Sequence, residues 1–493
     1  MLHRPLLAGI SLGLLAIGSL AKAEQSRPVV QTTAGSVEGI VKDATVYYLG
    51  IPYAEPPVGK LRWQPPQPKQ PWKGVLDATE YQNHCIQFPL NKTVQVGALI
   101  NASEDCLFLN VYTRRAEISR DNRRKPVMVW IHGGANIIGA SDYTDPAPLL
   151  ETGDVIVVSM NYRLGAFGFM AHPALAAEGH PFANYGVLDQ QLALKWVRDN
   201  ISRFGGDPLN VTIFGISAGG LNVTTHLISP GSAGLFQKAI IQSGAYLLDT
   251  PSLSYSEGLG TSVANRVGCA RQTSVATTAC LRALSVTDIL GHLSALLAED
   301  QPPREDKFLR PGWGYPQMTV DGQILPEPIR TAIEAGRIHR IPVLLGSTSD
   351  EEREFTCGAA DSLRSFSKWV PTFAYEFADR KATPAGATHG SEKRYLFNYE
   401  GVTGDQDYLS NFGGFRESAK ATDGPFKLAP QSRTVSEVIR QSWVAFAASG
   451  NPSTKRIPKW PRAPEGIQRL DTKLSVVSLK EFSIVHKCGP DST

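Results

Sequence analysis

One stretch of the 493-residue chain decides the fold, and it reads Val211-Thr212-Ile213-Phe214-Gly215-Ile216-Ser217-Ala218-Gly219. Its β-branched start predicts a strand, and residues 218–228 can form the helix that follows. Between them, the Gly-x-Ser-x-Gly pattern lets the chain turn sharply and leaves the serine hydroxyl exposed above the sheet. Backbone N–H groups at the helix N-terminus would favour negative charge that develops there. The stretch therefore predicts a nucleophile elbow with Ser217 as the nucleophile.

Other strand-like runs surround this turn, separated by helix-like segments. Strands are expected at residues 126–131, 155–161, 211–214, 238–242, 341–345 and 372–377. The clearest helices are expected at residues 189–204 and 436–448, and glycines follow both. This alternation is typical of a parallel sheet with both faces covered. We predict an α/β protein with a large, mainly parallel central sheet flanked by helices, and small antiparallel strands in the proline-rich first hundred residues.

A second glycine-rich loop follows the strand expected at 126–131 and reads His132-Gly133-Gly134-Ala135-Asn136. Small residues let backbone N–H groups approach a carbonyl oxygen closely. We predict an oxyanion hole formed by the N–H groups of Gly134, Ala135 and Ala218, with an ordinary turn as the alternative. His132 precedes the nucleophile, so we interpret it as a residue that orders the loop.

The general base is expected after Ser217, because a nucleophile elbow is followed along the chain first by an acid and then by a histidine. His226 and His292 fall in helix-like segments, and His339 precedes a strand at the wrong end of the sheet. His389 lies in a loop after the strand at 372–377, so we predict that His389 is the base. His486 is the remaining competitor.

The acid is expected in the turn that follows the strand at 341–345. Three carboxylates compete there, namely Asp350, Glu351 and Glu352. Their spacing does not choose among them, and a solvated acidic turn without a catalytic role is the alternative.

Four further motifs accompany the elbow, and with it they are highly specific. They are Gly50-Ile51-Pro52-Tyr53-Ala54, Glu104-Asp105-Cys106-Leu107-Phe108-Leu109-Asn110, Asn161-Tyr162-Arg163-Leu164-Gly165 and Phe204-Gly205-Gly206-Asp207-Pro208. With these motifs the chain resembles the type-B carboxylesterase family, which includes cholinesterases and bacterial carboxylesterases. The resemblance implies an α/β-hydrolase fold over almost the whole chain, Glu351 as the acid and His389 as the base.

The sequence departs from the family pattern at four points. Ile216 replaces a glutamate that commonly precedes the nucleophile, and the 85–106 loop lacks the tryptophan on which cholinesterases stack choline. Both differences argue against a cholinesterase. Asn136 replaces an aromatic residue and is expected to add polarity near the acyl side. Only 38 residues separate Glu351 from His389, where relatives insert several helices, so a more open pocket is expected.

The N-terminus has the pattern of a secretory signal peptide. An apolar stretch at residues 6–20 is followed by Ala21-Lys22-Ala23, so cleavage is expected after Ala23 and secretion or periplasmic export is predicted. A second Gly-x-Ser-x-Gly match at residues 9–13 lies in this segment and is interpreted as chance. The alternative is an uncleaved anchor. No linker divides the rest, so residues 24–493 are expected to form one domain.

Six cysteines are compatible with disulfides in an exported protein. Proximity favours pairing Cys85 with Cys106 and Cys269 with Cys280, and the family resemblance implies the same pairs. Cys357 and Cys488 would either pair with each other or remain two free thiols. No Cys-x-x-Cys motif occurs, so we expect neither a metal nor a cofactor.

Composition narrows the class of partner. The formal net charge is +3, and two basic residues without an acid in residues 1–23 leave +1 for the remainder. This balance disfavours nucleic acid, and no apolar run after the N-terminus predicts integral membrane association. We expect a serine carboxylesterase acting on small esters through an acyl-enzyme. A lipase acting at interfaces and a catalytically silent, cholinesterase-like binding protein are the alternatives; the oligomeric state is left open.

Overall fold

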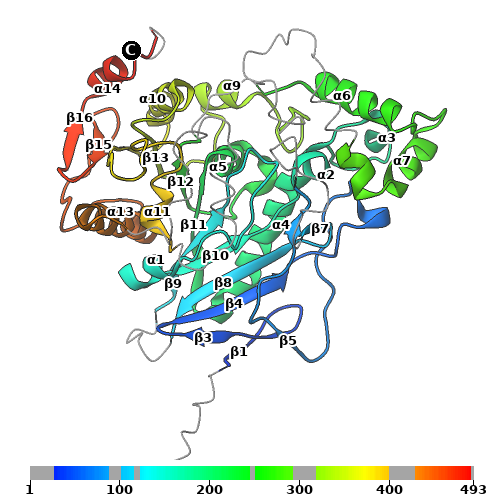
Figure 1. The fold of residues 1–493 in the computed structure, drawn as a ribbon, viewed down its shortest axis with the longest axis horizontal. Helices are drawn as coiled ribbons and strands as arrows, with labels where there is room; N and C mark the ends of the chain where they lie inside the picture. The colour runs from blue at the N-terminus through cyan, green and yellow to red at the C-terminus, as the bar shows by residue number, and fades with distance from the viewer. Residues whose placement is uncertain are drawn as a thin grey trace, which may run out of the picture.

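The computed structural model describes residues 27–87, 102–115, 123–244, 250–291, 318–398 and 428–489. Its main feature is an 11-stranded sheet, which fans out across the molecule in Figure 1. In spatial order the strands are β16 (Ser475–Val477), β15 (Ile467–Leu470), β14 (Thr372–Phe377), β13 (Val343–Thr348), β12 (Lys238–Gln242), β11 (Gly206–Ile216), β9 (Lys125–Ile131), β10 (Ile156–Met160), β8 (Phe108–Arg114), β4 (Thr45–Pro52) and β3 (Ile40–Lys42).

The centre of this sheet is parallel, and its two edges are antiparallel. Parallel pairing runs without interruption from β10 through β9, β11, β12, β13 and β14 to β15. The strands β3, β4 and β8 on one side and β16 on the other pair antiparallel with their neighbours. The predicted α/β-hydrolase architecture with a mainly parallel sheet is therefore confirmed.

Small strands precede the main sheet, as predicted. Strands β1 (Val29–Gln31) and β2 (Ser36–Glu38) pair antiparallel, and β5 (Val75–Asp77) adds to β2 in parallel. A second small pair joins β6 (His84–Cys85) to β7 (Ala102–Ser103).

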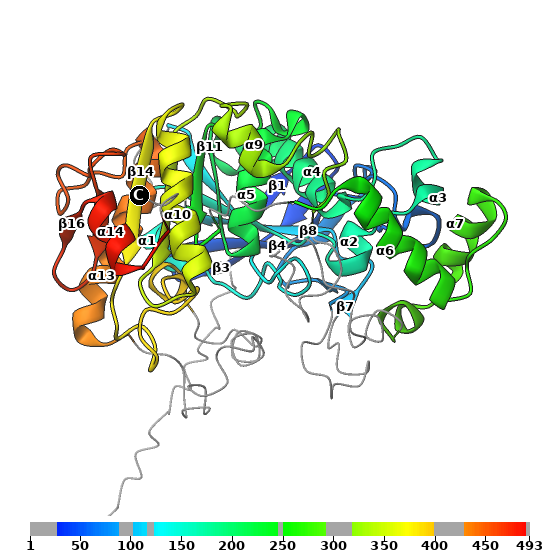
Figure 2. The ribbon, with the colours of Figure 1, turned by 90° about the horizontal axis from the view of Figure 1, so that it is seen from above.

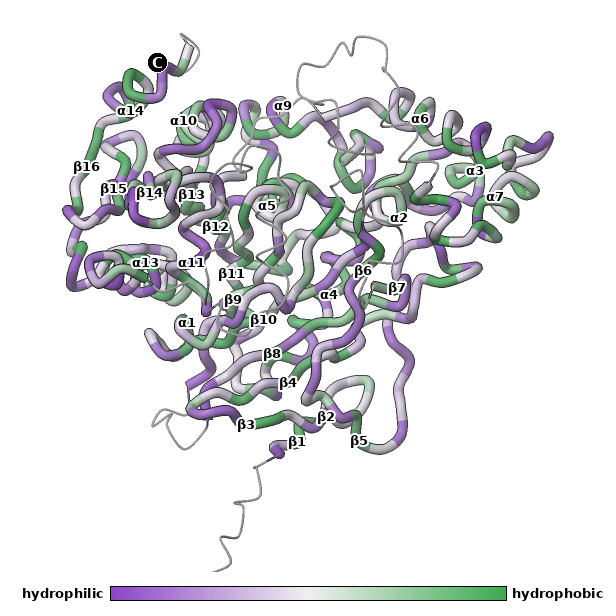
Figure 3. Tube along the Cα trace, viewed as in Figure 1, coloured by the Kyte–Doolittle hydropathy of each residue, from purple (hydrophilic) through white to green (hydrophobic). Residues whose placement is uncertain are grey.

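Alternate residues of the central strands face two separate apolar layers, because side chains of a strand point to opposite faces. Along β9, Val127, Val129 and Ile131 belong to one layer, whereas Met128 and Trp130 belong to the other. Figure 3 shows hydrophobic stretches along these strands in the middle of the molecule. Burial on both faces explains why the strands are continuous apolar runs in the sequence.

Helices cover both faces. The first layer is completed by α4 (Tyr185–Asn200), α5 (Ala218–Ile228), α9 (Ile329–Glu334) and α10 (Arg353–Ser367), and the second by α1 (Ala147–Thr152), α11 (Lys393–Leu396) and α13 (Pro430–Ser449). A third cluster lies between α2 (Gly165–Phe169), α3 (Pro173–Ala176), α6 (Leu253–Arg266) and α7 (Ser274–Ala283). This cluster lies at one end of the molecule, and α14 (Leu479–Val485) lies at the other (Figures 1 and 2). None of the described helices is long and apolar enough to cross a membrane.

Observed bounds differ from the expected ones at helix starts and at β11, which was expected at 211–214 and spans Gly206–Ile216. The helix expected at 189–204 begins at Tyr185 and gives way to a 3₁₀ turn after Asn200, and the one expected at 436–448 begins at Pro430. Proline fits the first turn of a helix, where its missing N–H has no partner to lose. Strand β13 begins at Val343, after Pro342, which has no N–H to donate to a ladder.

The parallel strands place all candidate site residues at one edge of the sheet. The loop 132–136 follows β9, Ser217 follows β11, Glu351 follows β13 and His389 follows β14. Carboxyl ends of neighbouring parallel strands lie side by side, which is where ligands bind in open α/β sheets. The fold thus converts a sequence spread over more than 250 residues into one local cluster.

Candidate active site

Ser217 lies on a strained turn between β11 and α5. Its backbone has φ 56° and ψ −124°, a conformation that side-chain-bearing residues rarely adopt. The Ser217 N–H donates to the Gln242 carbonyl at 2.9 Å, and its carbonyl accepts from Leu221 N–H at 2.9 Å. A Cβ added at Gly219 would lie 2.1 Å from the Ile131 carbonyl oxygen, so only glycine fits there. This is the geometry of a nucleophile elbow.

The predicted oxyanion loop packs directly on this turn. A Cβ added at Gly133 would lie 2.6 Å from the Ile216 carbonyl oxygen and 3.2 Å from Ser217 Cβ. The backbone N–H groups of Gly134 and Ala135 donate to no other group in the described part of the chain. The first hydrogen bond of α5 starts at Leu221, which leaves the Ala218 N–H ahead of the bonded turns. Three free donors are therefore available beside Ser217.

The Asn136 side chain connects the predicted oxyanion loop to its surroundings by hydrogen bonds. Asn136 is fully buried, and its Oδ1 accepts from Asn222 Nδ2 at 3.0 Å and from Tyr162 Oη at 3.3 Å. The expectation that Asn136 adds polarity near the acyl side stays a prediction. Asn136 has a φ of 54°, its Oδ1 contacts Asn222 of α5, and its Nδ2 is buried without a hydrogen-bond partner among the described residues.

His132 is a neutral member of the same loop. Its ring stacks on Tyr162 with centroids 4.4 Å apart, and its Nδ1 lies 2.8 Å from the Gly133 carbonyl oxygen. Burial lowers the pKa of His132 to about 4. A neutral imidazole locked against Tyr162 agrees with the interpretation that His132 orders the loop.

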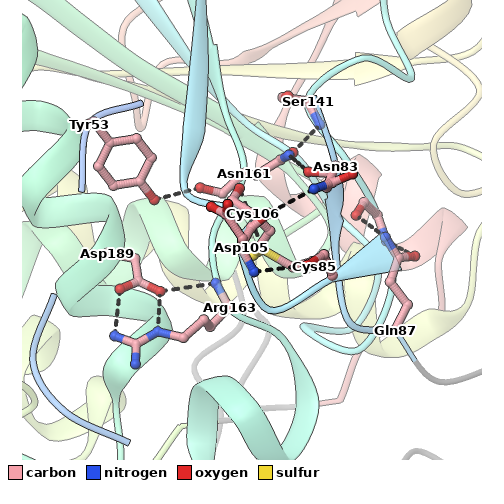
Figure 4. Close-up of a disulfide and its surroundings, with 12 residues drawn as sticks. Tyr53, Asn83, Cys85, Gln87, Asp105, Cys106, Ser141, Asn161, Arg163 and Asp189 are labelled. Carbon is pink, nitrogen blue, oxygen red and sulfur yellow. Dashed lines mark hydrogen bonds and ion pairs between the residues drawn. A yellow bond between two sulfur atoms is a disulfide. The ribbon is translucent and has the colours of Figure 1, made fainter. Parts of the chain in front are cut away.

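The far side of the oxyanion loop is tied to the Cys85–Cys106 disulfide, shown in Figure 4. Gln87 exchanges two hydrogen bonds with the Gly139 backbone, at 2.7 and 3.0 Å. Asn161 accepts from the Ser141 N–H at 2.8 Å and donates to the Asn83 carbonyl at 3.0 Å. These contacts fix residues 139–141, where the loop returns to the body of the protein.

Glu351 and His389 form a buried pair. His389 Nδ1 lies 2.6 Å from Glu351 Oε2, and the Glu351 side chain has no exposed surface. Glu351 Oε1 also accepts from Thr348 N–H at 2.8 Å and from Ser243 Oγ at 3.0 Å. An ionised Glu351 only accepts hydrogen bonds, so the proton lies on His389 Nδ1 and Nε2 is left as an acceptor. Nε2 is buried and has no hydrogen-bond partner among the described residues, Ser217 Oγ included.

Electrostatics favour the imidazolium form of His389. Burial alone would lower the pKa of His389, but the hydrogen bond and the charge of Glu351 outweigh it, and the pKa is raised from its ordinary value. The imidazolium that forms when a base takes a proton is therefore stabilised in place.

The turn that carries His389 lies beside the nucleophile turn. A Cβ added at Gly390 would lie 3.6 Å from Ile216 Cδ1, and Ile216 immediately precedes Ser217. The Phe355 ring of α10 packs on the imidazole, with centroids 4.2 Å apart. The sequence places these elements far apart, and the structure brings them together around Ser217.

The two neighbours of Glu351 do different work. Asp350 holds the loop before His389, because its Oδ2 accepts from Ala387 N–H at 2.9 Å and its N–H donates to the Ala387 carbonyl at 3.0 Å. Glu352 is exposed at the start of α10. Spacing could not choose among the three carboxylates, but their side chains point to different places. Of the three, Glu351 is the one hydrogen-bonded to His389.

The competing histidines lie elsewhere. His226 is fully buried and bonds Ser232 and Gln190, and burial lowers its pKa to about 3. His339 bonds the Ser229 carbonyl, and His486 pairs with Glu376 at 2.8 Å. His292 lies outside the described residues.

Ser243 and Phe355 are site residues that the sequence analysis did not single out. Ser243 follows β12 directly and has φ 44°, and a polar residue just after a buried strand was the available signal. Phe355 had no local signal, because its contact with His389 depends on how α10 packs. Within the described ranges, no group of three or more metal-ligating side chains is found.

Three comparisons with known proteins agree with this geometry. The model of the "Carboxylesterase family" matches residues 26–356. The chain is 32% identical to the para-nitrobenzyl esterase of Bacillus subtilis (strain 168), covering 94% of this chain and 98% of that protein. It is also 32% identical to the fumonisin B1 esterase of Sphingopyxis macrogoltabida, covering 92% of this chain and 87% of that protein. A solved PNB esterase structure superposes with a TM-score of 0.76 at 30% identity, covering 93% and 99% of the two chains.

Proposed function

Because this chain belongs to the carboxylesterase family and is a carboxylic ester hydrolase, we propose that it cleaves esters through an acyl-enzyme on Ser217, with His389 as the base and Glu351 as the acid. The observation that carries the proposal is the buried His389–Glu351 pair, 2.6 Å apart, on a turn that packs against the residue preceding Ser217. Its substrates are small-molecule esters.

Acylation begins with attack of Ser217 Oγ on the ester carbonyl carbon. His389 Nε2 takes the hydroxyl proton, and Glu351 holds the imidazolium through Nδ1. The carbonyl oxygen becomes an oxyanion, which accepts from the N–H groups of Gly134, Ala135 and Ala218. The intermediate then collapses, and the alcohol leaves with the proton from His389.

Deacylation repeats these steps with water. His389 Nε2 removes a proton from water, the hydroxide attacks the acyl carbon, and the same donors hold the second oxyanion. The carboxylic acid leaves and Ser217 regains its proton. Both half-reactions use one base and one oxyanion hole, so no metal or cofactor enters the proposed mechanism.

The proposed substrates are uncharged esters, including bulky ones. Replacement of the usual glutamate by Ile216 removes a charge beside the nucleophile, and Ile216 is buried. Between Glu351 and β14 the chain forms the single helix α10, so fewer elements are available to wall a pocket. The relatives include a para-nitrobenzyl esterase and a fumonisin B1 esterase.

The Ser217→Ala variant tests the proposal. We expect wild-type protein to hydrolyse p-nitrophenyl acetate and butyrate, and the variant to lose about 10³-fold or more in kcat, because the nucleophile is gone while the oxyanion hole remains. Circular dichroism and thermal unfolding check that the variant folds.

A labelling experiment complements the substitution. An organophosphate should inactivate the wild type with one covalent adduct, and peptide mass spectrometry should locate it on Ser217. Well-folded protein without esterase activity would contradict the proposed function. A sharp rise in rate above the solubility limit of the ester would instead favour a lipase.

A further inference from the structure

A second buried carboxyl group, Glu392, lies next to the His389–Glu351 pair and has no part in the mechanism above. Glu392 immediately precedes α11, three residues after His389, and has no exposed surface. Its Oε1 accepts from the Tyr375 hydroxyl at 3.3 Å. Its Oε2 is buried without a hydrogen-bond partner in the described part of the chain. A buried polar atom left in this way calls for an explanation.

The hydrogen bonds of the two carboxyl groups differ sharply. Three donors converge on Glu351, from His389, Thr348 and Ser243. Glu392 receives the Tyr375 hydroxyl at 3.3 Å, and the Gln242 side chain and the Glu392 backbone N–H act on it as weaker donors. Charge on a buried carboxylate is costly unless donors or an opposite charge compensate for it. The negative charge of Glu351 is therefore supported throughout, whereas Glu392 depends on a nearby positive charge.

That positive charge appears during turnover. From these contacts we propose that Glu392 is a positioning residue of the catalytic centre, a second carboxylate that stabilises the imidazolium form of His389 electrostatically. This inference rests on the proposed function, because His389 must act as the base. Glu392 neither touches the ester nor carries the transferred proton.

The groups around Glu392 determine whether its charge raises or lowers the pKa of His389. Burial and the charge of Glu351 raise the pKa of Glu392 to about 7, and His389 opposes the rise. Reciprocally, the raised pKa of His389 reflects the hydrogen bond and charge of Glu351, and then the charges of Glu352 and Glu392. Tyr375 and Gln242 are the remaining polar groups that act on Glu392. Ionised Glu392 makes His389 a stronger base, and protonated Glu392 does not.

The Glu392→Gln variant tests this role, because it keeps the shape and the acceptor for Tyr375 and removes the charge. Loss of the charge lowers the pKa of His389. The acid limb of the kcat/KM profile should therefore move to lower pH by about one unit, and kcat on the alkaline plateau should fall about ten-fold. A purely structural role would lower kcat without moving the acid limb. Glu392→Asp retains the charge, so its acid limb should lie close to the wild-type position.

Asp379→Asn is the matched control. Asp379 is a buried acid with a tyrosine partner, since its Oδ2 accepts from Tyr395 Oη at 2.9 Å. Its substitution should leave the acid limb in place. Tyr375→Phe provides a second test if Glu392→Gln does not fold, because removing the hydroxyl weakens support for the Glu392 charge. The acid limb should then move in the same direction by a smaller amount.

The outcomes separate the two proposals. Wild-type protein without esterase activity overturns the proposed function itself. The role of Glu392 alone would be overturned by a different result. In that case the wild type is active and Ser217→Ala is inactive, but the acid limb stays in place in both Glu392→Gln and Tyr375→Phe.

Discussion

The His389–Glu351 pair is held in place by residues at the ends of three neighbouring strands. Ser243 follows β12, Thr348 ends β13, and the loop carrying His389 follows β14. The donors from Ser243 and Thr348 fix the Glu351 carboxylate, and the carboxylate fixes the imidazole. A change of the Oε2 atom of Glu351 should therefore act mainly on His389, because Ser243 and Thr348 donate to Oε1.

Glu351→Gln is predicted to disable catalysis without unfolding the protein. The amide of glutamine can donate to His389 Nδ1, which favours the tautomer with the proton on Nε2, so the base can no longer accept from Ser217. A comparable change in serine hydrolases lowers kcat by about 10⁴-fold. Steady-state kinetics with p-nitrophenyl butyrate would measure the loss.

Glu352→Gln is the control for this prediction, because Glu352 is adjacent but exposed, so that solvent screens the effect of its charge on His389. We expect its kcat to stay within about two-fold of wild type, as for most surface substitutions. Equal losses in both variants would show that the acidic turn acts as a charged patch, and would contradict the assignment of Glu351.

At the residue scale, the sequence indicated which residues are candidates for the site better than it indicated where their side chains point. The strand–turn–helix context was enough to select Ser217, and position after a strand was enough to select His389. Spacing could not separate Asp350, Glu351 and Glu352, because neighbours in a turn differ only in where their side chains point. Burial is equally invisible in a sequence, which is why the buried Glu392 was missed.

Among the elements, α10 connects the active site to the C-terminus of the described chain. Its first turn carries Phe355, which packs on His389, and Cys357 follows two residues later. Cys357 pairs with Cys488, which resolves the alternative of two free thiols. His486 Nε2 also lies 2.8 Å from Glu376 Oε1 of β14. The C-terminal segment of the described chain is thus fastened to α10 at Cys357, six residues after Glu351.

Removing this disulfide is predicted to lower both stability and activity. It joins residues 131 apart in the sequence, and in the chain-entropy model a loop of that length contributes about 5 kcal/mol. The double variant Cys357→Ser and Cys488→Ser should unfold at lower denaturant and lose part of its kcat, because α10 positions Phe355. Denaturant titration and kinetics on the same samples would measure both effects.

The pair Cys269 and Cys280 provides the comparison. It closes a separation of only 11 residues, beside α6 and α7 at the opposite end of the molecule (Figure 1). The same model gives about 3 kcal/mol for its loss, and kcat of the remaining folded protein should be unchanged. A larger loss of kcat in this variant would contradict the link between α10 and the active site.

The bounds of a helix or strand could be predicted where residues close in sequence determine them. Strands β12 and β14 and helix α5 have the expected bounds, because buried runs and flanking turns mark them. Their order in the sheet was not predictable from these runs, since β9 lies between β10 and β11 through pairing of distant segments. The family resemblance supplied that architecture, and the pairing pattern agrees with it.

For the whole molecule, the disulfides and the N-terminal segment lead to one prediction. All six cysteines are paired, and such bonds persist in oxidising compartments. Residues 1–23 have the pattern of a cleavable signal, although they lie outside the described residues. We propose that the protein is exported and begins at Glu24. Protein recovered after export should have the mass of 470 residues minus six hydrogens, and should react with no thiol reagent after denaturation.

Cytosolic expression of residues 24–493 in a reducing strain is the decisive comparison. Without its disulfides the chain should expose six thiols on denaturation and unfold at lower denaturant, because the crosslinks no longer constrain the unfolded state. If exported protein retained Met1, the cleavage prediction would be wrong. If the reduced protein matched the oxidised one in stability, the disulfides would not be what ties the fold to an oxidising compartment, and export would then have to be argued from the leader alone.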